Sequence, residues 1–124
     1  MENVLTDPVL GHHLRLALSA LENKKAFQIV VLDVAQQTSI ADAFVICSVG
    51  SVRQAQAVCD EVTRILKEHS VRPLAVEGYS HGGWILMDYG DFLLHIFDEE
   101  RRAFYALERL WSDAPEVSAL LRTG

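Results

Sequence analysis

Gly50-Ser51 is the one local arrangement in this sequence that could hold a phosphate. The pair lies between an expected strand and an expected helix, and free backbone N–H groups at a helix N-terminus attract anions. The sequence contains neither G-x-x-x-x-G-K-[ST] nor G-x-G-x-x-G. A glycine turn followed by a serine N-cap is therefore the favoured interpretation.

A Gly-Ser pair at such a position also begins the nucleotide site of nucleotidyltransferases. That chemistry requires two carboxylates one residue apart on the following strand, both bound to one divalent metal. Here the following strand offers only Glu77. Asp60 and Glu61 are adjacent on a helix, so they diverge by about 100° and cannot share an ion. We expect no metal, no cofactor and no catalytic residues, and the alternative is a divergent nucleotide-binding or nucleotidyltransferase-type enzyme that uses Gly50-Ser51.

The histidines do not form a ligand pattern. His12-His13 lies on an expected helix, where sequence neighbours point in different directions, which favours surface residues. His95 lies within an apolar strand, so a hydrogen-bonded core or subunit-interface histidine is favoured over a catalyst. A Ser-His-Asp set could be assembled from Ser80, His81 and Asp88, but no G-x-S-x-G elbow supports it. His81 could instead contact a partner.

The stretch from Glu77 to Phe97 carries the clearest binding signal. It predicts a glycine-rich loop, a strand that starts at Trp84, a tight turn at Tyr89-Gly90-Asp91 and a second strand from Phe92. The large aromatic residues of this stretch fall in the loop and at the strand ends. Aromatic side chains with a polar atom commonly form binding surfaces at such positions. We therefore expect this hairpin to be both the centre of the fold and the surface that meets a partner.

Two aspartates flank the hairpin turn, and their role has two compatible interpretations. Asp91 caps the turn through its side chain. Alternatively, Asp88 and Asp91 lie exposed beside Trp84 and meet a cationic partner.

The elements that must position the hairpin follow from apolar spacing and turn residues. Asp7-Pro8 begins a helix that runs to about Asn23. Gln28–Val34 is a β-branched run that predicts a central strand covered on both faces. Ala43–Ser48 predicts a second strand, antiparallel to the first because the connection is short.

The second half of the chain continues the alternation. An amphipathic helix follows Gly50-Ser51, and Leu74–Glu77 predicts a short strand, which as a βαβ unit indicates a parallel neighbour. Asp98 begins a further helix that Pro115 ends, and Glu116–Arg122 is a short helical or frayed tail. The apolar side of that further helix is expected to comprise Phe104, Leu107 and Trp111, with Ala103 and Leu110 beside them.

Length and composition bound the class of protein. The 124 residues suffice for one domain, and no apolar run approaches the 18 or so residues that span a bilayer. The net charge of −6 argues against a generic nucleic-acid or anionic-membrane binder but suits a basic protein partner. Cys47 and Cys59 form no C-x-x-C pair, and no secretory leader is evident, so we expect a cytoplasmic protein with reduced thiols.

Several segments, in order along the chain, resemble the Iojap/RsfS family of ribosomal silencing factors. Together they cover about residues 15 to 115, and we divide the chain accordingly into an N-terminal extension and helix start (1–13), an Iojap/RsfS-like domain (14–115) and a C-terminal tail (116–124). The matching segments are Val30–Val34, Ser39–Asp42 with Phe44–Ile46, Gly50–Gln54, Pro73-Leu74, Val76–Gly78, Trp84–Asp91, His95–Phe97, and Tyr105 with Leu107–Trp111.

This resemblance implies an α/β domain with a mixed sheet of about five strands flanked by helices, related to the nucleotidyltransferase fold but without its catalytic carboxylates. It also implies a function. Members are typically homodimers when free, and they bind the large ribosomal subunit through the ribosomal protein called L-fourteen. They thereby prevent subunit joining and repress translation when nutrients are scarce. Self-association through the same hairpin, as a scaffold, is a further alternative.

The resemblance also implies which residues meet the partner. Trp84 matches the contact tryptophan of the family and would be the anchor, with Leu86 two residues along the same strand face. The complete set of expected partner-binding residues is Trp84, Leu86, Asp88, Asp91, Tyr79, Glu77, Gly78 and Tyr105. Neither sequence-specific nucleic-acid binding nor membrane binding is expected.

Overall fold

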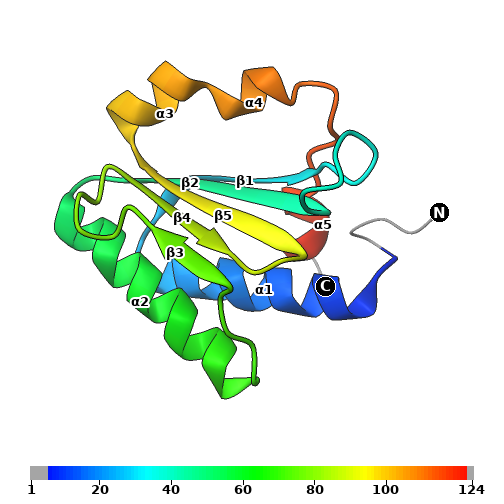
Figure 1. Ribbon diagram of the computed structural model, residues 1–124, viewed down its shortest axis with the longest axis horizontal. Coiled ribbons are helices and arrows are strands. Elements are labelled where there is room, and N and C mark those ends of the chain that lie inside the picture. The colour runs from blue at the N-terminus through cyan, green and yellow to red at the C-terminus, as the bar shows by residue number, and fades with distance from the viewer. Residues whose placement is uncertain (1–5, 123–124) are drawn as a thin grey trace.

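The computed structural model describes residues 6–122, so the first five residues of the expected N-terminal extension and the last two of the tail lie outside the described residues. Figure 1 shows the arrangement of the elements. In chain order they are α1 (Pro8–Asn23), β1 (Phe27–Asp33), β2 (Ala43–Val49), α2 (Val52–Glu68), β3 (Ala75–Glu77), β4 (Trp84–Asp88), β5 (Phe92–Asp98), α3 (Glu99–Tyr105), α4 (Leu107–Leu110) and α5 (Ser118–Arg122).

The strands form one five-stranded mixed sheet in the order β1-β2-β5-β4-β3. The pairs β1–β2, β5–β4 and β4–β3 are antiparallel, and β2–β5 is parallel. Helices α1 and α2 cover one face of the sheet, and α3 and α4 lie over the other face (Figure 1). The prediction of an α/β domain with a mixed sheet of about five strands is confirmed, and so is the central β4–β5 hairpin.

The alternation of side chains along β5 divides the core into two parts. Phe92, Leu94 and Ile96 belong to the larger cluster, which α1 and α2 cover. Phe97 belongs to the smaller cluster on the α3–α4 face, and Leu93 packs against it. The β4 residues that pair with Leu93, His95 and Phe97 therefore point to the same side, toward α3 and α4 or the solvent beside them.

The prediction that the first strand is central and covered on both faces is wrong, because β1 is an edge strand. Its first two residues are exposed, and only its last three are buried. A β-branched run has the same composition at an edge and at the centre. Here the C-terminal segment covers the edge. Leu32 forms a bridge with Glu116. The Val31 carbonyl accepts from the Val117 backbone N–H, and the Val31 N–H donates to Oγ of Ser118.

The expected parallel neighbour of β2 is β5 rather than the short third strand. β3 runs parallel to β2 but lies at the far edge, with β5 and β4 between them. β5 has seven residues and pairs with all seven of β2. β3 has three exposed residues and could not cover the fully buried β2.

The single helix expected after Asp98 is interrupted. Its expected apolar side is confirmed at Leu107 and Trp111 and is wrong at Phe104 and Leu110. Ala106 adopts a left-handed conformation (φ 48°, ψ 50°) between α3 and α4. This residue turns the chain, so a continuous helical spacing does not describe the two segments. As a result Phe104 is 78% exposed and Leu110 is 73% exposed, whereas Leu107 and Trp111 pack against the smaller core cluster.

Residues 116–122 pack onto the domain. Val117 and Leu121 are buried in the larger core cluster, and α5 contacts α1 and β1. The packing of the domain thus extends beyond residue 115. Across residues 6–122, the helices are too short or too polar to span a bilayer.

Candidate partner-binding surface

Strand β4 presents a row of half-exposed side chains on the α3–α4 side of the sheet. Its burial alternates, so that Trp84, Leu86 and Asp88 are partly exposed while Ile85 and Met87 are buried. Glu77 on the edge strand β3 is exposed and lies directly opposite Leu86. We call Glu77, Trp84, Leu86 and Asp88 the Trp84 face. The structure therefore brings four of the eight expected partner-binding residues together on one surface.

Trp84 rests on a fixed aromatic support. Its ring stacks on the buried Phe97, with 4.9 Å between centroids and 29° between the ring planes. Tyr105 of α3 contacts the indole as well, at 4.5 Å between centroids. The expected residue Tyr105 therefore belongs beside the Trp84 face, where it helps to hold the indole.

His95 binds the polar atom of the same indole. The Nε1–H group of Trp84 donates to Nδ1 of His95 at 3.2 Å. Burial of His95 lowers its pKa to about 4, so the ring is neutral near pH 7. Because Nδ1 accepts, Nε2 carries the proton in this arrangement. Nε2 is buried, and no hydrogen-bond acceptor for it is found among the described residues. The expectation of a hydrogen-bonded core histidine is confirmed for Nδ1.

The two aspartates of the hairpin make different contacts. Asp88, rather than Asp91, caps the turn, because its Oδ1 accepts from the Gly90 backbone N–H at 2.8 Å. Asp88 shares the strand face of Trp84 but lies about 13 Å along the strand from it. The carboxylate of Asp91 contacts Nδ1 of His13 on α1 at 3.3 Å. Asp91 therefore does not lie beside Trp84, contrary to the alternative that both carboxylates do.

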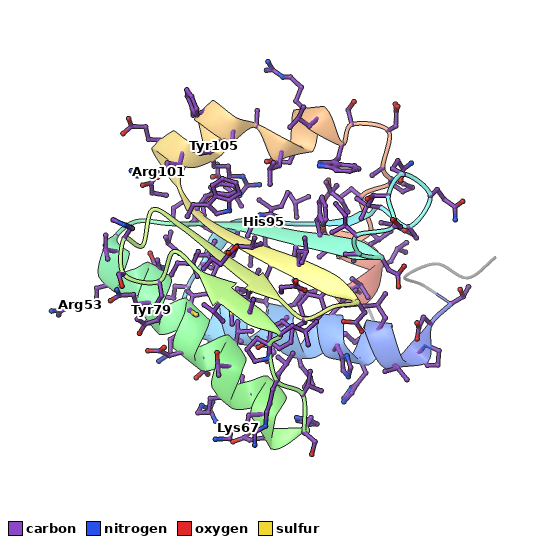
Figure 2. All side chains as sticks on the ribbon, viewed as in Figure 1. Arg53, Lys67, Tyr79, His95, Arg101 and Tyr105 are labelled. Atoms are coloured by element: carbon purple, nitrogen blue, oxygen red, sulfur yellow. The ribbon has the colours of Figure 1, made fainter. Side chains whose placement is uncertain are left out.

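Gly78 and Tyr79 lie in the loop before β4, and each has a structural role there. Gly78 has φ +82°, and a Cβ atom there would lie 2.1 Å from the carbonyl oxygen of Trp84, so only glycine fits. The Tyr79 hydroxyl donates to Asp60 of α2 at 3.0 Å. Figure 2 shows Tyr79 near α2 and Tyr105 below α3, on opposite sides of the sheet. Tyr79 thus ties the loop to α2 and is not part of the Trp84 face.

The Gly50-Ser51 pair is the beginning of α2, as the favoured interpretation predicts. Ser51 is the N-cap, and its Oγ accepts from the Gln54 backbone N–H at 3.0 Å. The Gly50 N–H donates to the Gln54 side chain at 2.7 Å. These contacts occupy groups that a phosphate would need. In the range 6–122, no three metal-ligating side chains gather at one point.

Replacing Ser51 by alanine should lower the free energy of unfolding by about 1 kcal/mol, the usual effect of losing a serine N-cap. Urea denaturation followed by circular dichroism measures this change. The matched control is Ser51→Asp, which keeps an oxygen acceptor at the cap and should retain most of the stability. Equal stability of the alanine variant and the wild type would contradict the capping role.

Sequence reasoning missed the supporting layer under Trp84. Phe97 and His95 lie on the neighbouring strand, and Phe97 is the direct partner of Trp84 in the β4–β5 register. The signal was present in the predicted hairpin: pairing its two strands around the turn at Gly90 places Trp84 opposite Phe97. The hydrogen bond between Trp84 and His95 requires side-chain geometry and has no sequence signal.

The fold and this surface together define a small α/β protein with a preformed aromatic surface of the kind that binds other proteins. The model of the RsfS family, described as "Ribosomal silencing factor during starvation", matches residues 9–123. The ribosomal silencing factor RsfS of Halalkalibacterium halodurans is 41% identical over 104 residues, which are 84% of this chain and 89% of that protein. The chain belongs to the RsfS family of ribosomal silencing factors.

Further relatives extend this similarity. A crystal structure of a protein from Chromobacterium violaceum superposes with a TM-score of 0.79 at 34% identity, and the match covers 82% of this chain and 84% of that one. A mouse protein named "Mitochondrial assembly of ribosomal large subunit protein 1" is 29% identical over 100 residues, which are 78% of this chain and 44% of that protein.

Proposed function

We propose that this protein binds the large ribosomal subunit through ribosomal protein L-fourteen and sterically blocks the joining of the small subunit, thereby repressing translation under nutrient limitation. Membership in a family of ribosomal silencing factors supports a ribosomal partner. The name of the mouse relative, which refers to assembly of the large subunit, favours that subunit. Steric exclusion requires a shaped surface with affinity for its partner and needs neither a cofactor nor a chemical step.

The observation that carries this proposal is the Trp84 face. Trp84 is partly exposed, yet Phe97, Tyr105 and His95 already fix its ring. A large aromatic side chain that is ordered before binding loses little conformational entropy when a partner covers it. Tryptophan is also the residue type most enriched at binding hot spots. The face therefore has the composition and the rigidity of an interface anchor.

The charge of the protein suits a basic ribosomal protein. The chain carries a net charge of −6, and Glu77 and Asp88 contribute carboxylates to the Trp84 face. Opposite charge on two partners accelerates their encounter and orients it. We also propose that the free protein is a cytoplasmic homodimer, an expectation that rests on the family resemblance and that light scattering after gel filtration tests.

Co-sedimentation with purified ribosomal subunits tests the proposed function. The protein should pellet with large subunits through a sucrose cushion and should stay in the supernatant with small subunits alone. Pelleting with large subunits that lack L-fourteen would contradict the proposed contact. A supernatant location in every mixture would contradict ribosome binding altogether and would favour the self-association alternative.

Replacing Asp88 by asparagine should slow association with the large subunit at low salt, because the substitution removes a charge from the Trp84 face. Asparagine keeps an oxygen that can accept from the Gly90 N–H, so the turn should be preserved. Stopped-flow or surface-based binding at several salt concentrations measures the association rate. Glu68→Gln, at the far end of α2, is the control with the same change in charge. Equal slowing by both variants would show a general charge effect and contradict a local role of Asp88.

A further inference from the structure

His95 lies directly behind the partly exposed indole of Trp84, at a point where the family resemblance assigns no role. We propose that His95 is a positioning residue for partner binding: its Nδ1 atom holds the Trp84 indole N–H, so that Trp84 presents its ring, and not its N–H group, to the partner. This inference rests on the proposed function, because it concerns the same surface. It adds a buried residue that never touches the partner.

The geometry around the indole supports this role. The N–H to Nδ1 distance is 3.2 Å, and Phe97 stacks on the indole from the neighbouring strand. Tyr105 contacts the ring from α3. The hydrogen bond selects the χ2 orientation that directs the indole N–H toward His95. Stacking alone would also permit the ring turned over about the Cβ–Cγ bond, because χ2 of tryptophan is broad and roughly two-fold. Figure 2 shows His95 between the sheet and α3, on the same side as Tyr105.

A histidine at this buried position lowers the stability of the fold, which supports a role other than stability. His95 is only 5% exposed, and its Nε2–H group lacks an acceptor among the described residues. Burying a polar group without a partner lowers the stability of a protein. The surroundings are aromatic: Phe44 contacts the imidazole edge-on at 5.4 Å, and Phe97 lies parallel to it at 6.0 Å. A leucine would suit these neighbours better, so what the histidine contributes is its acceptor.

A consequence follows for the chemistry of the partner. Because the indole N–H is already bonded inside the protein, it does not donate to a carbonyl of the partner. Recognition of Trp84 then relies on contact with the ring, which suits aliphatic side chains or a lysine or arginine placed over its face. Such a partner also matches the carboxylates of the Trp84 face.

Two variants of His95 separate positioning from structure. His95→Leu removes the acceptor and should weaken binding to the large subunit about tenfold, while its stability to urea equals or exceeds that of the wild type. His95→Asn places an oxygen close to the position of Nδ1 and should restore most of the affinity. Wild-type affinity for the leucine variant would overturn the inference, as would failure of the asparagine variant to bind better than leucine. If the wild type itself does not bind large subunits, the proposed function fails instead.

Nuclear magnetic resonance of the wild-type protein tests the positioning without any partner. The Trp84 indole N–H, assigned with a Trp84→Phe variant, should exchange slowly with solvent and should show coupling or proximity to His95. The nitrogen shifts of His95 should show a protonated Nε2 and an unprotonated Nδ1. Rapid exchange of the indole N–H, or a proton on Nδ1, would overturn the inference even if every His95 variant failed to fold.

Discussion

Replacing Trp84 by alanine should weaken binding to the large ribosomal subunit by about 2 kcal/mol or more, which corresponds to about thirtyfold in Kd. The physical reason is the combination of exposure and order. The indole is partly exposed, and Phe97, Tyr105 and His95 hold it in place. Its removal takes away contact area that costs little entropy to present.

Titration of fluorescently labelled protein with large subunits measures this loss of affinity. Trp111→Ala is the matched control, because Trp111 is also partly buried against the smaller core cluster but contacts Phe44 near α4 and not the Trp84 face. The folded control should retain the wild-type Kd within about threefold, since Trp111 contacts Phe44 and not the Trp84 face, and distant sites act independently. A folded Trp84→Ala variant with wild-type affinity would refute the anchor role.

Replacing Phe97 by alanine should lower the free energy of unfolding by about 3–5 kcal/mol, the range for a buried phenylalanine. Phe97 is fully buried and forms the floor beneath Trp84. The substitution removes the stacking partner of the indole and leaves a cavity in the smaller core cluster. Urea denaturation followed by tryptophan fluorescence and circular dichroism measures the change.

Phe104→Ala is the control for that experiment, because it deletes the same side chain from an exposed position. Phe104 is 78% exposed on α3, so its removal should change the free energy of unfolding by no more than about 0.5 kcal/mol. Similar losses in the two variants would contradict the description of α3, in which Phe104 faces solvent. They would instead favour the apolar helix side that the sequence predicts.

Most helices and strands of this fold can be predicted from the sequence, because residues close in the chain mark where they begin and end. Two helix starts have such signals: Asp7-Pro8 and Gly50-Ser51. The structure confirms Asp7 and Ser51 as the N-caps. The turn around Gly90 predicts the β4–β5 hairpin, and the alternation along β4 predicts that Trp84 and Leu86 share a face. Each of these features depends on residues close in sequence, where side-chain period and turn chemistry decide the outcome.

The errors concern properties that depend on distant parts of the chain. Whether β1 is an edge or a central strand depends on where β5 inserts, and a β-branched run does not record that. The left-handed Ala106 reorients α4, and alanine gives no warning of such a conformation. One of the two interpretations of Asp91 places it beside Trp84, but its carboxylate contacts His13 on α1 instead.

Some residues of the candidate site can be predicted from the sequence, and others only from the structure. Residue type and position pointed to Trp84, while the supporting residues His95 and Phe97 became evident only from packing and register. Tyr79 and Trp84 are near one another in the sequence, yet Tyr79 bonds to α2 on the other side of the sheet. Proximity along the chain is thus a poor guide to a shared surface when one residue lies in a loop and the other begins the strand that follows it.

A subunit-joining assay tests the central claim most directly. Purified large and small subunits are mixed under conditions that favour joining, with saturating wild-type protein or with the Trp84→Ala variant, and the products are separated on a sucrose gradient. We predict that the wild-type protein keeps the subunits apart and that the variant allows them to join. Complete joining in the presence of wild-type protein that is bound to the large subunit would contradict silencing by steric exclusion.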